Sequence, residues 1–266
     1  NVKFFVGLVT VNTGGTWTNT INEAVTFRGG IANNGTFTAG TGTQTFDTNS
    51  QAISGNVTMS NVTVTTVTLT NNGTLTVSSA LSVTGTLTNG STGTLNIGGT
   101  AGITTLTATA AGNIVNYNGA AQTVKATTYS NLTLSGSGTK TFSANTVISN
   151  LMVVSSGVKV NLNGITTHTT GVLTLGGTGP LSSSWGATGS GAVNTTNTYF
   201  TGSGRITING TAPGSAIDSN YASYSNAIGD LGATVGEYTG PLTLTAPNGT
   251  VFINTKFASY GLRSEE

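Results

Sequence analysis

The chain has 266 residues and a net charge of +1, and only 6% of its residues are charged, against about 25% in an average soluble domain. The eight basic residues are scattered, which excludes the Lys and Arg clusters of a nucleic-acid-binding protein. The chain has no cysteine, so disulfides and thiolate metal sites are excluded, and no apolar run approaches the ~20 residues that span a bilayer. Abundant β-branched residues and a mean hydropathy of +0.10 argue against disorder, which combines low hydrophobicity with high net charge.

The first segment of the chain, residues 2–11, is apolar at both odd and even positions, and a strand of this kind expects both faces to be covered. It could pair with the first turn of its own fold beneath a loop, add to the sheet of a neighbouring subunit as an exchanged strand, or be the remnant of a signal or anchor. We define residues 1–15 as an N-terminal strand and a candidate intersubunit joint. Its candidate assembly residues are Val2, Phe4, Phe5, Val6, Leu8, Val9 and Val11.

An alternation of apolar and polar residues dominates residues 16–180. In Val62–Val64, Thr66–Thr70 and Thr74–Val77, every second residue is apolar and most of the others are Thr. A period of two places the apolar residues on one face of a strand and the Thr residues on the other. Turn signals rich in Asn and Gly separate these runs, so we predict short strands along the whole segment.

One stretch of sequence recurs roughly 70 residues further on. Residues 45–64 and 116–134 share an aromatic residue, a Gln, a β-branched residue and then Ser-Asn followed by an apolar-Thr-apolar triplet. An internal repeat indicates a stacked, quasi-one-dimensional architecture. Stacked like charges repel one another, whereas ladders of Thr or Asn do not, so the scarcity of charge fits stacking. We predict an all-β fold, a β-solenoid of short Thr-rich strands over residues 16–180.

The composition changes after Pro180, because three of the four Pro and five of the seven acidic residues lie beyond it. Terminal repeats of solenoids are atypical because an open end must be blunted. We therefore predict that residues 181–266 form an atypical C-terminal cap or assembly region, with at most one short helical stretch, at residues 220–231. Its expected strands are residues 207–209, 241–245 and 250–256.

The inventory of chemical groups favours a non-catalytic protein. The one histidine, His168, stands within a run of Thr and is expected at a surface ladder position, and no acidic residue lies within 40 positions of it. A nucleophilic triad would need a base and an orienting carboxylate, and a zinc site would need three or four ligands. We expect no enzyme activity, no catalytic residues, no metal site and no cofactor.

Asn-X-Ser/Thr motifs and Thr-X-Thr motifs are both frequent. Asn-Gly-Thr predicts exposed turns and candidate glycosylation at Asn34, Asn72, Asn209 and Asn248. The Thr-X-Thr motifs resemble those of ice-binding solenoids, which carry ranks of this motif on one flat face. Here the spacing of the motif is not constant, which argues against a regular rank.

Residues 129–141, which read Tyr-Ser-Asn-Leu-Thr-Leu-Ser-Gly-Ser-Gly-Thr-Lys-Thr, resemble repeats of bacterial cell-surface β-solenoid proteins of the adhesin-like and filamentous-haemagglutinin-like kind. The resemblance covers roughly residues 30–175. It implies a secreted, surface-exposed protein with a structural or adhesive role, and it implies no catalytic residues.

These observations predict a structural subunit of an extracellular, pilus-like surface filament or fibre. A nearly uncharged surface promotes association, open sheet edges are templates for another chain, and head-to-tail contacts that do not close form filaments. We expect a homopolymer joined by strand pairing, without a nucleic-acid partner or a membrane span, from a processed or partial chain that begins at Asn1. The alternatives are a monomeric adhesin that binds glycan or a solid surface, and an ice-binding protein.

Overall fold

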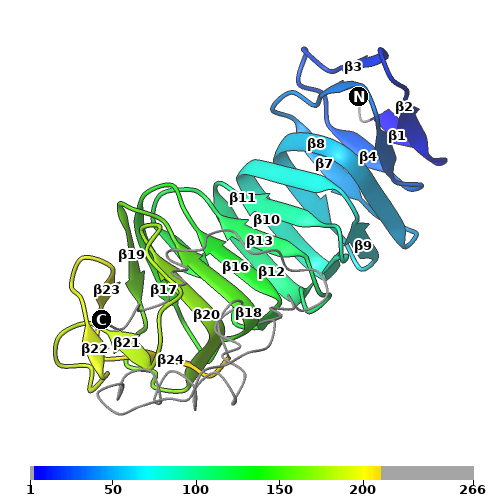
Figure 1. Ribbon diagram of the computed structural model, residues 1–266. Coiled ribbons are helices and arrows are strands. Elements are labelled where there is room, and N and C mark those ends of the chain that lie inside the picture. The colour runs from blue at the N-terminus through cyan, green and yellow to red at the C-terminus, as the bar shows by residue number, and fades with distance from the viewer. Residues whose placement is uncertain (1–2, 211–266) are drawn as a thin grey trace, which may run out of the picture. The chain divides into compact units, whose positions relative to one another are not determined.

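A computed structural model describes residues 3–210, which form a β-solenoid of about nine turns (Figure 1). The described residues contain no helix, and their strands stack in parallel along the solenoid axis. The prediction of an all-β solenoid is therefore confirmed. The chain divides into two compact units, residues 1–212 and 213–266, and the described residues all belong to the first.

Each turn supplies one strand to each of three faces, and the longest strands bend around the corners between faces. Face 1 contains β1 (Lys3–Phe5), β4 (Val25–Phe27), β7 (Thr43–Phe46), the end of β8 (Gln51–Val64), the middle of β10 (Thr74–Asn89), the start of β12 (Thr100–Thr107), β14 (Gln122–Val124), β17 (Gly138–Phe142), β19 (Val158–Asn161) and β23 (Phe200–Thr201).

Face 2 contains β2 (Val9–Val11), β5 (Ile31–Asn33), the start of β8, β9 (Thr68–Asn71), the ends of β10 and β12, β15 (Thr128–Tyr129), the starts of β18 (Val147–Val154) and β20 (His168–Leu175), and β24 (Arg205–Ile208). Face 3 contains β3 (Thr16–Thr18), β6 (Thr36–Thr38), the middle of β8, the start of β10, β11 (Thr94–Ile97), β13 (Ile114–Tyr117), β16 (Asn131–Leu134), and the ends of β18 and β20.

The core is a set of apolar columns that run from turn to turn. On face 3, Leu75 pairs with Leu95, Leu95 with Val115, and Val115 with Leu132, and all four side chains are fully buried. Complete burial of a side chain of this size stabilises the fold by about 1.5–3 kcal/mol. The alternating sequence therefore produces one continuous dry interior, with Thr and Asn facing outward.

The N-terminal segment forms the first turn of the solenoid. β1 pairs with β4, and β2 pairs with β5, so this segment pairs within its own chain. Phe5 packs edge-on against Trp17 with ring centroids 5.0 Å apart, and Trp17 stacks on Phe37 at 5.7 Å. Aromatic side chains thus fill the interior of the first two turns.

Strands continue beyond residue 180, because β23 and β24 extend the stacks of faces 1 and 2. Residues 176–199 are an insertion that contains β21 (Ser184–Gly186) and β22 (Asn194–Thr195), and β21 pairs antiparallel with β24. The strand predicted at residues 207–209 corresponds to the end of β24. The elements predicted at residues 220–231, 241–245 and 250–256 lie outside the described residues.

The two copies of the sequence repeat lie on different faces. Phe46 ends a strand of face 1, whereas the equivalent Tyr117 ends a strand of face 3. Hydrogen-bonded neighbours in adjacent turns are mostly 18 to 20 residues apart, so an offset of about 70 residues is not a whole number of turns. The repeated sequence therefore forms one corner and the strand beside it, and its two copies occupy different corners of the solenoid.

Candidate binding surface

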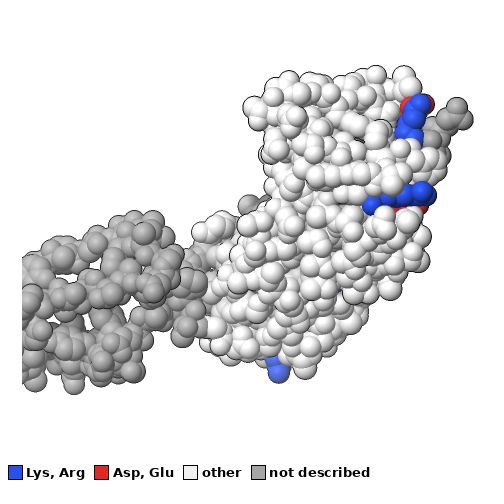
Figure 2. Space-filling view, turned by 90° about the vertical axis from the view of Figure 1, so that its right-hand side faces the viewer, with Lys and Arg blue, Asp and Glu red and all other residues white. Residues whose placement is uncertain are grey.

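Charged side chains lie towards the two ends of the described solenoid. Lys3 Nζ is 3.7 Å from Glu23 Oε2, and Arg28 Nε donates to Asp47 Oδ1 at 2.8 Å. That hydrogen bond lowers the pKa of Asp47 and raises the pKa of Arg28. Residues 48–124 contain no charged residue, and they make up most of turns 3–6. We call them the charge-free belt, and Figure 2 shows a largely uncharged surface on one side of the molecule.

Six Thr side chains stand in register on face 2 of the charge-free belt. Three Thr-Leu-Thr triplets pair strand to strand, with each Leu inside and each Thr outside. Thr68 pairs with Thr86 and Thr86 with Thr105, while the second Thr of each triplet forms a parallel file. We call these six residues the Thr array: Thr68, Thr70, Thr86, Thr88, Thr105 and Thr107.

The Thr array presents free hydroxyl groups at regular intervals. All six residues are half-buried or exposed, and none of the six hydroxyls forms a hydrogen bond with another described residue. Adjacent strands lie about 4.8 Å apart and alternate residues of one strand about 6.6 Å apart. The array is therefore a lattice of three rows and two files with nearly fixed spacing.

One file of the array continues along face 2. Ala108 bridges to Tyr129, which places Thr128 next in the file after Thr107. The file then continues through Val147, Thr169 and Thr207. Face 2 thus carries outward Thr side chains well beyond the three turns of the array.

Face 3 also carries Thr and Asn, but these side chains bond to one another. Asn96 Nδ2 donates to Thr76 Oγ1 at 3.2 Å, and Asn116 Nδ2 donates to Asn96 Oδ1 at 3.1 Å. Nearer the C-terminal end, the outward positions of face 3 become aliphatic, as at Leu151 and Val153. The polar groups of face 3 are thus partly satisfied internally, whereas the hydroxyls of the Thr array remain free to bind.

A ladder of Asn side chains supports the corner between faces 2 and 3. Asn71 Nδ2 donates to Asn89 Oδ1 at 2.8 Å, and Asn89 Nδ2 donates to the carbonyls of Gly93 and Ile114 at 3.0 and 2.9 Å. Both Asn side chains are fully buried. Flat sheets are often stabilised by specific side-chain ladders, and the predicted stacking of Asn side chains is confirmed here.

Inward polar side chains satisfy carbonyls at the other corners. Gln122 Nε2 donates to the carbonyls of Ile97 and Gly99 at 2.8 and 2.9 Å. Lys140 Nζ donates to the carbonyls of Gly119 and Ala120 and to Gln122 Oε1, at 2.7, 2.6 and 2.8 Å. The Lys140 side chain is fully buried, and burial lowers its pKa to about 8. The repeated Gln of the sequence is therefore a corner residue rather than a site residue.

His168 was expected on the surface, and that prediction is wrong. Its side chain is fully buried, accepts a hydrogen bond at Nδ1 from the Thr146 backbone N–H at 3.2 Å, and packs edge-on against Phe142. Burial lowers the pKa of His168. The ring fills an inward position that an apolar residue fills in other turns, so it serves packing.

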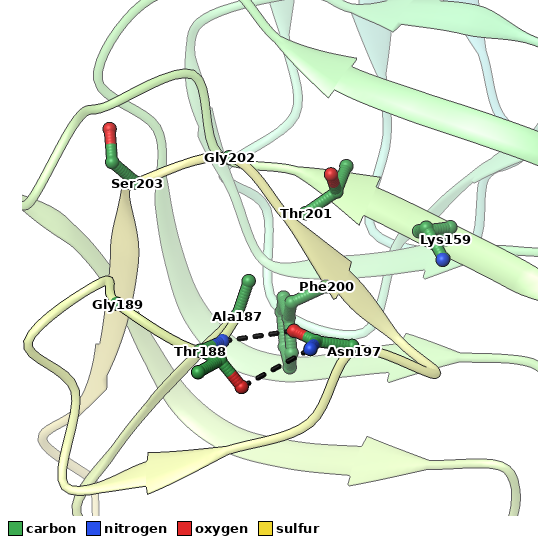
Figure 3. Close-up of a pocket in the computed structure, with 9 residues that line it drawn as sticks. All are labelled: Lys159, Ala187, Thr188, Gly189, Asn197, Phe200, Thr201, Gly202 and Ser203. Carbon is green, nitrogen blue, oxygen red and sulfur yellow. Dashed lines mark hydrogen bonds between the residues drawn. The ribbon is translucent and has the colours of Figure 1, made fainter.

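Within residues 3–210, no group of three or more His, Cys, Asp or Glu side chains could hold a metal ion. A hollow of about 360 Å³ lies between the insertion and the last turns (Figure 3). Asn197 Oδ1 accepts from the Thr188 backbone N–H at 2.9 Å, and Asn197 Nδ2 donates to Thr188 Oγ1 at 3.2 Å. These polar groups bond to each other, and Phe200 beside them is buried. The other polar side chains of the lining are Lys159, Thr201 and Ser203, and Ser203 lies on the opposite side of the hollow from Lys159 (Figure 3).

The candidate assembly residues divide between the interior and the surface. Val11 is buried, and Phe5 and Val9 are half-buried against the core. Phe4, Val6 and Leu8 are 56%, 70% and 60% exposed, and Phe4 lies beneath the Arg28 guanidinium with its ring centroid 5.0 Å away. Val2 lies outside the described residues.

Three of the candidate glycosylation residues are accessible. Asn34, Asn72 and Asn209 are exposed, and the first two lie at the corner between faces 2 and 3. Asn248 lies outside the described residues.

Sequence reasoning found part of the Thr array and missed the rest. The Thr-X-Thr motifs at Thr68, Thr70, Thr86 and Thr88 are evident in the sequence, but Thr105 and Thr107 did not stand out. The signal that unites all six is the Thr-Leu-Thr triplet, although one such triplet, at Thr74, lies on face 3.

No protein-family model matches the chain, and no match is found among the curated proteins or the solved structures. Among the described residues, none forms a helix of the length and apolarity required to cross a membrane.

Proposed function

We propose that this chain is a non-catalytic, extracellular surface-binding solenoid of the adhesin type, which attaches through face 2 to an extended, uncharged surface. The observation that carries the proposal is the Thr array, which stands in register within the charge-free belt. A periodic ligand is the natural partner of a periodic array, because one alignment brings all of its groups into contact at once. Each contact is weak, but linked contacts raise the overall affinity.

The charge distribution supports a neutral ligand. Described charges lie at Lys3, Glu23, Arg28 and Asp47 on one side of the belt, and from Lys125 onward on the other. A polyanionic or polycationic partner would find no complementary groups at the Thr array. Binding through hydroxyl and methyl groups should therefore resist screening by salt.

Co-sedimentation with a panel of solids tests the proposal. The full chain is mixed with ice, crystalline cellulose, chitin and silica at low and at high salt, and the bound fraction is measured. We expect the protein to adsorb to at least one of these solids, with a bound fraction that salt does not change. Adsorption to none of them, or adsorption that salt abolishes, would contradict the proposal.

A self-assembling filament is the second candidate function, and one observation favours it. β1 and β2 each pair on one side only among the described strands, and Val6 and Leu8 beside them are exposed. An unpaired strand edge is a template for a second copy of the chain, and repeated head-to-tail addition would produce a fibre.

Negative-stain electron microscopy across a concentration series tests the filament. We expect filaments from the wild-type chain and dispersed particles from the double variant Val6→Ser and Leu8→Ser. The matched control replaces two other exposed apolar residues, Ile21→Ser and Val193→Ser, and should still form filaments. Dispersed wild-type particles at every concentration would reject assembly.

A further inference from the structure

We propose that the ligand of the Thr array is ice, so that the protein binds the ordered water of a crystal face. This inference rests on the proposed surface-binding function and names its ligand. It assigns a site to six side chains of face 2, Thr68, Thr70, Thr86, Thr88, Thr105 and Thr107.

The composition of the array suits water more than any other partner. Each Thr offers a methyl group, around which water forms an ordered shell, and a hydroxyl group that both donates and accepts hydrogen bonds. All six positions carry the same residue, so the same arrangement of water repeats at each. The hydroxyls have no described hydrogen-bond partner, so water can bond to them without displacing an internal contact.

The spacing of the array is set by the backbone. Rows repeat at about 4.8 Å between strands, and files at about 6.6 Å along a strand. Hexagonal ice has a short and a long repeat of similar size along its principal axes. The strands pair in register, so no irregular row interrupts the array. A small mismatch between the array and the ice lattice is therefore spread evenly along each file.

The surroundings of the array favour a flat surface and leave it uncharged. A sheet ordinarily twists, and side-chain ladders oppose the twist. The buried Asn71 and Asn89 ladder lies at the corner directly beside the array. No charged residue occurs between Asp47 and Lys125, so no strongly hydrated ion disturbs the adjoining water.

A carbohydrate is the principal competing ligand, and the array lacks what carbohydrate binding uses. The apolar face of a sugar ring packs well against a flat aromatic side chain, and no aromatic residue points outward from the array. Tyr129, which follows the array on face 2, is fully buried, and so is Tyr117 on face 3, the one aromatic residue of the charge-free belt. The array is therefore better suited to a lattice of water than to a chain of sugar rings.

Ice-affinity partitioning and an ice-recrystallisation assay test the inference with the full chain. The key variant is Thr88→Tyr, which places a bulky ring in the middle of the array. The matched control is Thr58→Tyr on face 3, at an exposed position without a side-chain hydrogen bond. Thr105→Tyr is a second array variant at an exposed position, and far-UV circular dichroism and thermal melting confirm that each variant is folded.

We expect the wild type and Thr58→Tyr to enter the ice fraction and to arrest recrystallisation. Both array variants should need at least tenfold higher concentration for the same arrest. On cellulose and chitin, Thr88→Tyr should bind no less than the wild type, because an aromatic ring favours sugar contact.

Four results would overturn the ice inference. The wild type could be excluded from ice yet adsorb to another solid, in which case surface binding stands and ice as its ligand fails. It could adsorb to no solid, in which case both proposals fail. If folded Thr88→Tyr and Thr105→Tyr still bind ice, the Thr array is not the ice-binding site. Equal loss in Thr58→Tyr would show that the effect is not specific to face 2.

Discussion

The Asn ladder at the corner between faces 2 and 3 gives the most quantitative prediction. Replacement of Asn89 by Ala removes three hydrogen bonds, one from Asn71 Nδ2 at 2.8 Å and two to the carbonyls of Gly93 and Ile114 at 3.0 and 2.9 Å. Asn89 is fully buried, so water cannot replace these bonds without entering the core. The control is Asn72→Ala at the same corner, where the side chain is exposed.

The cost of Asn89→Ala follows from the partners that remain. Asn71 Nδ2 keeps its bond to the Thr94 carbonyl, and the Gly93 carbonyl keeps its bond from the Ile114 N–H, so neither group is left without any partner. Each lost bond then costs about 1 kcal/mol, which gives about 3 kcal/mol for the substitution. Asn72→Ala should change the free energy of unfolding by less than about 0.5 kcal/mol.

Urea unfolding followed by far-UV circular dichroism measures the difference between the two variants. With a slope of about 2–3 kcal/mol per molar urea, Asn89→Ala should lower the midpoint by about 1–1.5 M relative to Asn72→Ala. Because solenoids can unfold in stages, amide hydrogen exchange at Thr94 and Ile114 provides a local readout, and protection there should fall. Equal midpoints and equal protection in the two variants would refute the role of the Asn ladder.

Three further predictions concern the corners and the buried titratable groups. Gly73→Ala should lower the free energy of unfolding by about 3 kcal/mol or more in thermal or urea melts, because an added Cβ atom would clash with the Gly55 carbonyl oxygen. Gly102→Ala should be neutral, because a Cβ atom there meets nothing within 4 Å. The pKa of Lys140 is about 8 when folded and 10.5 in the unfolded chain, so the free energy of unfolding should rise as the pH increases above about 8. Lys140→Met should remove this rise when urea melts are compared up to about pH 9.5, and a rise that persists in the variant would contradict the assignment. The lowered pKa of His168 means that the unfolded chain binds its proton first as the pH falls below about 6.5, so stability should decrease there, and His168→Gln should flatten this acid dependence in thermal melts.

The sequence predicts the strands and their inner and outer faces well, because alternation acts locally. Val62 and Val64 point inward with Thr63 between them, as period two requires. The same rule identifies the inward orientation of Lys140, which shares its parity with the buried Phe142. A buried Lys is nevertheless costly on its own, and its carbonyl partners at Gly119 and Ala120 lie about 20 residues away in sequence. Only the stacking of turns brings them together.

The register of the Thr array could not be predicted from spacing. The triplets at Thr68, Thr86 and Thr105 follow one another at intervals of 18 and 19 residues, and the pairing of β10 with β12 shifts register between Val83 and Thr86. Irregularities at corners absorb the differences in length, so strands stay aligned although their spacing varies. Uneven spacing of the motif in the sequence therefore did not prevent the strands of these three turns from pairing in register.

His168 shows the limit of reading polarity from neighbours. The run Thr166 to Thr170 contains no apolar residue to mark an inward face, so alternation carries no signal there. Pairing with Ile206 of β24, a buried residue nearly 40 positions away, reveals that His168 faces the interior. The insertion at residues 176–199 lengthens the chain between β20 and β24, which pair with each other. Sequence periodicity does not predict an insertion of this kind.

A comparison of the three faces tests the central claim most directly, namely that face 2 is the binding face. One lysine is introduced per face at positions without a side-chain hydrogen bond, as Thr63→Lys on face 1, Thr88→Lys on face 2 and Thr58→Lys on face 3. The bound fraction of each variant is then measured on the solid that adsorbs the wild type most strongly. The account predicts that Thr88→Lys alone loses most of its binding, whereas equal binding by all three variants, or a selective loss on face 1 or face 3, would contradict it.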